Sequence, residues 1–221
     1  IESGRARAQS TEVIARYHMV TGKEVKFDSI EFDKASEDVE IAALRLSRIN
    51  YPVQLHFGDA KKMAYKLVQD AVGPVVVLID GPKGAHAIDL ALRLLSSSKV
   101  KAVFVHDVHK NDKELRQLVE RWPVFVSSDE LNFVENFSYL DAQCWDEHQR
   151  YSRFRGWGPY KRNDRIMLSY GPTLVGLINV IDTNDREIAI RSLRPKVRFL
   201  AQKRRILGFM LGIKTRLNAA D

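Results

Sequence analysis

The chain lacks several features that would have decided its class at once. Its 221 residues include one cysteine, Cys144, so no internal disulfide can form. No uninterrupted apolar run approaches the ~20 residues that span a bilayer as a helix. The first residues have neither an initiator methionine nor the apolar core of a signal peptide, and we expect the numbering to begin inside a longer natural chain. The glycine pattern GxGxxG of dinucleotide-binding loops is also missing.

Acidic residues are scarce at one end only. The net charge is +7, yet residues 1–187 carry 26 Lys and Arg against 27 acids, while residues 188–221 carry nine against one. We therefore expect a domain over 1–183 and a basic amphipathic extension over 184–221. A basic tail suits an anionic membrane surface or nucleic acid, of which nucleic acid is the less favoured, or it is a solvated helix face. The single cysteine and this tail favour an intracellular or membrane-associated protein.

Short apolar runs alternate with helical patterns along the first 126 residues. The run Val75–Ile79 is rich in β-branched residues, stops at Asp80-Gly81-Pro82 and predicts a strand buried on both faces. Similar strands are predicted at 1–2, 27–32, 53–57, 101–105 and 124–126, with helices over 10–21, 37–49, 59–72, 85–97 and 111–122. This alternation predicts an α/β fold with a doubly wound, mostly parallel, Rossmann-like sheet. In the first helix, Val13, Ile14 and Tyr17 form the expected buried face.

The pattern changes after Pro123. Residues 127–163 are aromatic and basic in part, and predict an insertion or lid, or a plain surface excursion. Residues 166–170 and 173–181 flank Gly171-Pro172 and predict a terminal antiparallel hairpin at the sheet edge. Beyond Asp182 a basic helix keeps Val197, Leu200, Leu207 and Leu211 on one face, which would pack on the domain, on a partner or on a membrane surface.

Acidic residues follow four successive predicted strands. They are Glu2, Glu31, Asp59 and Asp80. The carboxyl ends of parallel strands meet at one edge of a sheet, where ligands bind, so these carboxylates would line one rim. Each also has a structural explanation as a helix cap or a solvated loop acid; Asp59 before Ala60 is a good N-cap, and Asp80 could cap the helix that follows it.

The same stretches resemble the class I S-adenosylmethionine-dependent methyltransferases. The matching motifs are ExGxxxAxST at 2–11, SIEFD at 29–33, HFGDA at 56–60, VVLIDGPKG at 76–84 and AVFVHDVHK at 102–110. Within this family they are most similar to the small-molecule O-methyltransferase branch. The resemblance covers about residues 1–126, and residues 166–181 match the last two strands of the family less closely.

The resemblance implies a role for each rim residue in S-adenosylmethionine binding. It places Glu2 and Gly4 near the methionine part of the cofactor and Ser10 near its carboxylate. It places Glu31 on the ribose hydroxyls. Asp59 and Ala60 would lie beside the adenine, and Asp80 near the sulfonium and the methyl acceptor.

The resemblance also implies a possible divalent cation such as Mg²⁺. Metal-dependent relatives hold one with carboxylates after their fourth and fifth strands, where this chain has Asp80 and Asp107, with His106 or His109 nearby. Two residues depart from the pattern of the family. Ala8 occupies the position of a glycine in the cofactor loop, and His106 occupies a position where many relatives have a second acid. His106 is therefore a ligand, a general base or a hydrogen-bonded loop histidine, and Lys83 is a base, an anion contact or a solvated lysine.

The leading hypothesis is O-methylation of a small-molecule acceptor, with Asp80, His106 and Asp107 at the reacting oxygen. Two alternatives stay open. One is a NAD-binding oxidoreductase, against which the loop without GxGxxG argues. The other is a non-catalytic interaction module that keeps the fold and works through its basic tail.

Overall fold

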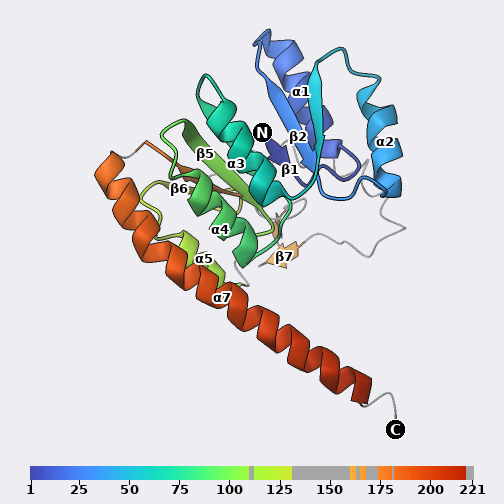
Figure 1. Ribbon diagram of the computed structural model, residues 1–221. Helices are drawn as coiled ribbons and strands as arrows, with labels where there is room; N and C mark the ends of the chain where they lie inside the picture. The colour runs from blue at the N-terminus through green and yellow to red at the C-terminus, as the bar shows by residue number, and fades with distance from the viewer. Residues whose placement is uncertain (110–111, 131–159, 163–164, 168–173, 181, 218–221) are drawn as a thin grey trace.

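One seven-stranded sheet forms the centre of the molecule. The computed structural model describes the chain except residues 110–111, 131–159, 163–164, 168–173, 181 and 218–221. The strand order is β3-β2-β1-β4-β5-β9-β6, and only the two pairs that include β9 are antiparallel (Figure 1). The strands are β1 (Glu2–Ser3), β2 (Phe27–Glu31), β3 (Val53–Phe57), β4 (Val75–Ile79), β5 (Val100–His106), β6 (Phe125–Ser127) and β9 (Leu174–Ile178).

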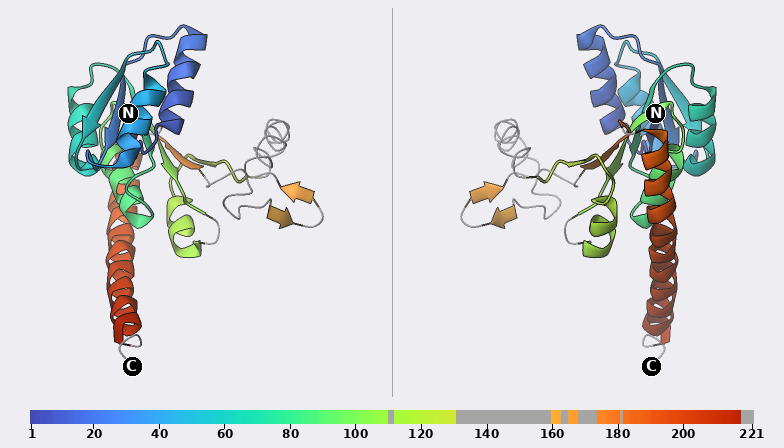
Figure 2. Two further views of the ribbon diagram at one scale, coloured as in Figure 1. Left: turned by 90° about the vertical axis from the view of Figure 1, so that its right-hand side faces the viewer. Right: turned by 90° about the vertical axis from the view of Figure 1, so that its left-hand side faces the viewer.

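The direction of the crossovers places helices on both faces. From β1 the chain moves outward to β2 and β3 through α1 and α2, whereas α3 and α4 carry it the other way to β4 and β5. Right-handed crossovers that travel in opposite directions put their helices on opposite faces, as Figure 2 shows for α1 and α3. The predicted doubly wound α/β fold is confirmed. The helices are α1 (Gln9–Thr21), α2 (Glu37–Leu46), α3 (Ala60–Asp70), α4 (Ala85–Leu94), α5 (Lys113–Val119) and α7 (Thr183–Leu217).

Strand β4 is buried mainly on one face. Val75, Val77 and Ile79 are buried, but Val76 is 52% exposed. Alternate side chains of a strand point to opposite faces, and α1 and α2 lead away from β4 towards β3. The prediction of a strand buried on both faces is therefore wrong at Val76.

The last strand enters the sheet instead of extending it. β9 pairs antiparallel with β5 on one side and with β6 on the other, which confirms an antiparallel pair at this edge. The partner expected for it, residues 166–170, lies partly outside the described residues. Its described part belongs to β8 (Arg165–Met167), which pairs with β7 (Tyr160–Arg162). Most of the expected insertion at 127–163 also lies outside the described residues.

Helix α7 joins the domain through its first half. Leu193, Val197, Leu200 and Ala201 are part of the main core, and the helix packs against α4 and α5. Packing on the domain is thus confirmed for Val197 and Leu200, whereas Leu207 is exposed. Figure 1 shows the second half projecting past the sheet. None of the described helices combines the length and apolar character that crossing a lipid bilayer requires.

Candidate functional site

The turns after β1 and β4 are in direct backbone contact. The chain reverses its direction of travel between these two strands, which in open α/β sheets is where ligands bind. The amides of Asp80 and Gly81 both donate to the carbonyl of Ser3, and the Ser3 hydroxyl donates to the carbonyl of Gly81 at 2.5 Å. Gly4 has φ +85°, and a Cβ there would lie 2.4 Å from the Gly81 nitrogen. Only glycine fits this crossing point.

Glu2 is the buried anchor of the first loop. Its side chain is fully buried, and its carboxylate accepts hydrogen bonds from Ser10 Oγ at 2.5 Å, Thr11 Oγ1 at 2.5 Å and Ser29 Oγ at 2.7 Å. These three donors come from α1 and β2. Glu2 and Ser10 are therefore in direct contact, and Glu2 ties the loop to its neighbours.

Glu31 closes the other side of the same loop. Its carboxylate accepts the amide of Ala6 at 2.6 Å and that of Phe32 at 2.7 Å. Each carboxylate oxygen has more than one acceptor site, so Glu31 can still accept from a ligand. Ala8, at the N-cap of α1, is buried with φ 59°, a left-handed conformation that suits glycine better than alanine.

Asp59 and Ala60 lie one strand further along the rim. Asp59 is the N-cap of α3 and accepts the amide of Lys61 at 2.8 Å, and Ala60 is the first residue of that helix. The amide of Gly58 donates to the carbonyl of Glu31 at 2.8 Å, which joins this turn to the end of β2. Of the four rim acids predicted from the sequence, Glu31, Asp59 and Asp80 lie at or just after the ends of β2, β3 and β4. The prediction is wrong for Glu2, which begins β1 level with Ser29 and Leu78 and is fully buried.

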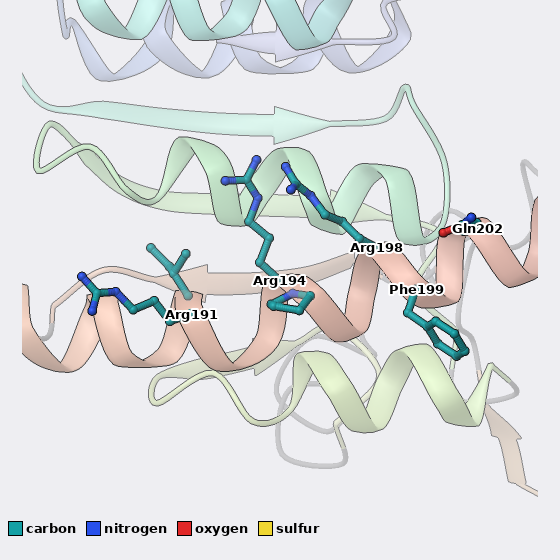
Figure 3. Close-up of a pocket in the computed structure, with 7 residues that line it drawn as sticks. Arg191, Arg194, Arg198, Phe199 and Gln202 are labelled. Atoms are coloured by element: carbon teal, nitrogen blue, oxygen red, sulfur yellow. The ribbon is translucent and has the colours of Figure 1, made fainter.

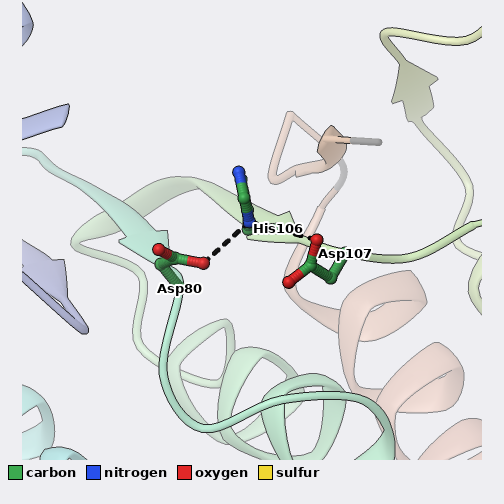
Figure 4. A group of neighbouring side chains, drawn as sticks. All are labelled: Asp80, His106 and Asp107. Atoms are coloured by element: carbon green, nitrogen blue, oxygen red, sulfur yellow. Dashed lines mark ion pairs between the residues drawn. The ribbon is translucent and has the colours of Figure 1, made fainter. Parts of the chain in front are cut away.

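The ends of β4 and β5 bring together a cluster of charged side chains. His106 Nδ1 lies 2.7 Å from Asp80 Oδ1 and 3.4 Å from Asp107 Oδ1 (Figure 4). The Lys83 ammonium is hydrogen-bonded to Asp80 and lies 2.5 Å from Asp107 Oδ2, so it bridges the two carboxylates. His109 is at the margin, with Nε2 3.7 Å from Asp107. We call Asp80, Lys83, His106 and Asp107 the acceptor cluster.

The charges of this cluster support one another. Burial raises the pKa of Asp80, but hydrogen bonds from His106 and Lys83 outweigh it and hold that pKa below its usual range. The hydrogen bond to Asp80 raises the pKa of His106 against the opposite effect of burial. Burial lowers the pKa of Lys83, and its hydrogen bonds to Asp107 and Asp80 more than compensate, so Lys83 is a cation at neutral pH.

The donor set fits a divalent cation in part. Asp80, His106 and Asp107 each offer one ligand atom, and these atoms lie within 4.8 Å of one another. Two carboxylates with an imidazole suit Mg²⁺ or Mn²⁺. However, Lys83 already pairs with the same two carboxylates, so an ion would have to displace its ammonium.

Sequence reasoning missed the bridging position of Lys83. The sequence left three roles open for Lys83: a base, an anion contact or a solvated lysine. In the structure its side chain is half exposed and is bonded to both Asp80 and Asp107. The signal was present in the spacing Asp80-x-x-Lys83 across a turn, because residues three apart in a turn come close together. The link to Asp107 depends on the neighbouring strand and could not be inferred from spacing.

Comparisons with known proteins find similarity to solved structures. No protein-family model matches the chain, and no curated protein matches it. A similar solved structure is that of M. capricolum TrmK in complex with S-adenosyl-homocysteine. It shares 12% sequence identity, covers 90% of this chain and 88% of that chain, and has a TM-score of 0.36. A likeness of this degree does not indicate a shared activity or substrate.

Proposed function

We propose that this chain is an S-adenosylmethionine-dependent methyltransferase that methylates an oxygen of a small-molecule acceptor. The observation that carries the proposal is the contact between the Gly4 loop and the Asp80-Gly81 turn, at the point where the sheet reverses direction. The amino terminus of α1, the carboxylates of Glu31 and Asp59, and the acceptor cluster lie along the same carboxyl edge of the sheet. A nucleoside with a charged tail fits such an edge.

The cofactor would lie across the ends of β1, β2 and β3. Glu31 would accept the two ribose hydroxyls, because it is the last residue of β2, and Asp59 and Ala60 would lie beside the adenine. Gly4 and Ser10 would face the methionine part, because Gly4 lies in the loop between β1 and α1 and Ser10 lies in the first turn of α1. Glu2 would keep this loop in place by accepting hydrogen bonds from the hydroxyls of Ser10, Thr11 and Ser29.

The acceptor cluster would act on the oxygen that receives the methyl group. In the proposed reaction the acceptor O–H gives its proton to His106 in its neutral form. The oxygen then forms a bond to the methyl carbon as the bond from that carbon to sulfur breaks, leaving S-adenosylhomocysteine. Lys83 is a cation here, so it would stabilise the developing negative charge on oxygen, while Asp80 and Asp107 orient Lys83 and His106.

A divalent cation, if one binds, would be held by Asp80, Asp107 and His106. Such an ion lowers the pKa of a bound hydroxyl. Lys83 offers a positive charge at the same carboxylates without an ion. The chain's own side chains can therefore supply the charge that the reaction needs.

The test is calorimetric titration with S-adenosylhomocysteine. The parent chain should bind it, and Glu31→Ala should bind at least about tenfold more weakly, because two hydrogen bonds to a charged group are lost, roughly 1.4 kcal/mol. Glu24→Ala removes an exposed acid before β2, away from the rim, and should bind like the parent. Binding of NAD in place of S-adenosylhomocysteine would favour the oxidoreductase, and no nucleoside binding at all would favour the interaction module.

A further inference from the structure

Helix α7 turns an apolar stripe towards solvent. Ile188 is 57% exposed, Phe199 69% and Ile206 52%, although the opposite side of the helix is buried in the core. Residues 188, 195, 199 and 206 are separated by seven, four and seven positions, so they lie on one face of the helix. We call this set, with Pro195 as its fourth member, the outer stripe.

Cations border the outer stripe on both sides. On the side of α4, Arg194 and Arg198 each lie 2.9 Å from Asp89 Oδ1. On the side of α5, Lys203 pairs with Glu114 at 2.8 Å. Figure 3 shows Arg194 and Arg198 reaching to one side of the α7 axis and Phe199 to the other, around a hollow in the helix surface. The remaining cations on the exposed part are Arg191, Lys196 and Arg205.

Much of this positive charge is not neutralised. Lys196 and Arg205 make no ion pair within the described part of the chain, and Arg191 pairs only with the exposed Glu187 at 3.3 Å. From 188 to the end of α7 the sequence contains no acid. The surface therefore has an unmatched positive charge with an apolar stripe through its middle.

This combination matches the surface of an anionic bilayer better than nucleic acid. A helix that lies in the headgroup region inserts its apolar stripe and extends flanking Lys and Arg towards lipid phosphates. Nucleic acid would use the cations and one stacking ring, but would leave Ile188 and Ile206 without a role. An apolar partner protein would not require a cation on each flank.

We propose that the outer face of α7 docks the protein on anionic lipid bilayers. The interface consists of the outer stripe and its flanking cations, Arg191, Lys196, Arg198, Lys203 and Arg205. The inference does not depend on methyl transfer, since it uses no residue of the rim. Arg204 pairs with Asp112 in the connection after β5 and comes within 4.0 Å of the Cβ position of Gly84, so α7 passes the carboxyl edge of the sheet. Docking would bring that edge close to the lipid.

The experiment is cosedimentation of the full chain with phosphatidylcholine vesicles, with and without phosphatidylglycerol. We expect binding only when phosphatidylglycerol is present. Phe199→Ser/Ile206→Ser should weaken it about tenfold or more through lost insertion. Lys196→Gln/Arg205→Gln should weaken it roughly tenfold or more through lost charge. Val72→Ser and Lys23→Gln, both exposed and outside α7, should bind like the parent.

A second measurement reports insertion directly. Phe199→Trp should gain a blue-shifted emission component on phosphatidylglycerol vesicles, relative to the parent, and brominated lipid should quench it. Absence of this component, or absence of cosedimentation with anionic vesicles, would overturn the proposal. A competition result would also overturn the proposal. If single-stranded RNA released the parent from vesicles and Phe199→Ser/Ile206→Ser bound that RNA as tightly as the parent, the face would be a nucleic-acid surface.

Discussion

Gly4 and Gly81 touch through their backbones, and this contact joins the first loop to the turn after β4. A Cβ on Gly4 would lie 2.4 Å from the Gly81 nitrogen and 2.7 Å from the Asp80 carbonyl carbon, and φ at Gly4 is +85°. Neither backbone segment can move aside without breaking the hydrogen bonds to Ser3. The two turns that bound the candidate site therefore have a fixed relative position.

Gly4→Ala should lower the free energy of unfolding by more than about 3 kcal/mol, from steric overlap combined with a strained φ. Urea denaturation followed by circular dichroism measures this. Gly73→Ala is the matched control, because nothing lies within 4 Å of its Cβ position and its φ is not in the left-handed region. Equal unfolding midpoints for the two variants would contradict the account of the crossing point.

Glu2→Gln should destabilise the chain by about 1–3 kcal/mol. The amide keeps the size of the side chain, but it replaces a carboxylate oxygen with a donor that faces the donors of Ser10, Thr11 and Ser29. The same denaturation experiment measures the loss, with the exposed Glu24→Gln as its control. If Glu2→Gln were as stable as the parent, the carboxylate would not be the anchor of this loop.

Lys83→Met should bind Mn²⁺ or Mg²⁺ at least about fivefold more tightly than the parent, since the ammonium competes for the carboxylates of Asp80 and Asp107. Calorimetry or the Mn²⁺ resonance signal measures the affinity. Lys62→Met, on the exposed side of α3, should have no effect. Weaker metal binding by Lys83→Met would show that the lysine does not compete, and no binding by either chain would remove the ion from the proposal.

The sequence was sufficient for the parallel part of the fold. β2, β3 and β4 agree with the predicted ranges to within a residue, because β-branched runs between turn residues leave few alternatives. The helical spacing over 111–122 predicts a buried stripe of Leu115, Leu118, Val119 and Trp122; Leu115, Val119 and Trp122 are buried and Leu118 is partly buried, although α5 ends at Val119, before Trp122. The position of β9 between β5 and β6 depends on pairing between distant segments, which local patterns do not encode.

The buried face of α1 was predicted correctly only at Ile14, which is partly buried against a small core cluster. Val13 and Tyr17 are exposed, and the face turned inward carries Thr11 and Ala15. The hydroxyl of Thr11 donates to buried Glu2, so this side of the helix faces the domain. Apolar spacing alone cannot reveal a polar side chain whose partner lies on another element. Glu31, Asp59 and Asp80 were foreseeable as a group for the opposite reason, since parallel strands end at the same edge.

The His106 imidazole should titrate above the usual value of about 6.5, because its protonated form is hydrogen-bonded to Asp80. Proton NMR of the ring measures the midpoint. Asp80→Asn should lower it, and Lys83→Met should raise it further, since the ammonium opposes a second positive charge. Shifts in the same direction for both variants would contradict the geometry of the cluster.

The same shift fixes the sign of a pH effect on stability. A raised folded-state pKa means that the stability from the His106–Asp80 pair is fully present below about pH 6.5 and is lost as pH rises through the folded pKa. At low pH the stability from this pair depends on ionised Asp80. Because the pKa of Asp80 is lowered, that stability is lost only as pH falls through the lowered value. The stability difference between the parent and His106→Gln should therefore be largest in weak acid and shrink above neutrality. A difference that grew with pH would rule the pair out as its source.

Helix α7 is structural over its first half and exposed over its second, and two leucines test where the change occurs. Leu200 is 4% exposed and packs in the main core, whereas Leu207 is 49% exposed. Leu200→Ala should cost about 2–5 kcal/mol, because it removes buried methyl groups and leaves a cavity. Leu207→Ala should cost less than roughly 0.5 kcal/mol, as expected for a surface substitution. Similar losses at both positions would mean that the projecting half is also packed. A negligible loss at Leu200 would support the division at residue 183, with α7 as a separate extension.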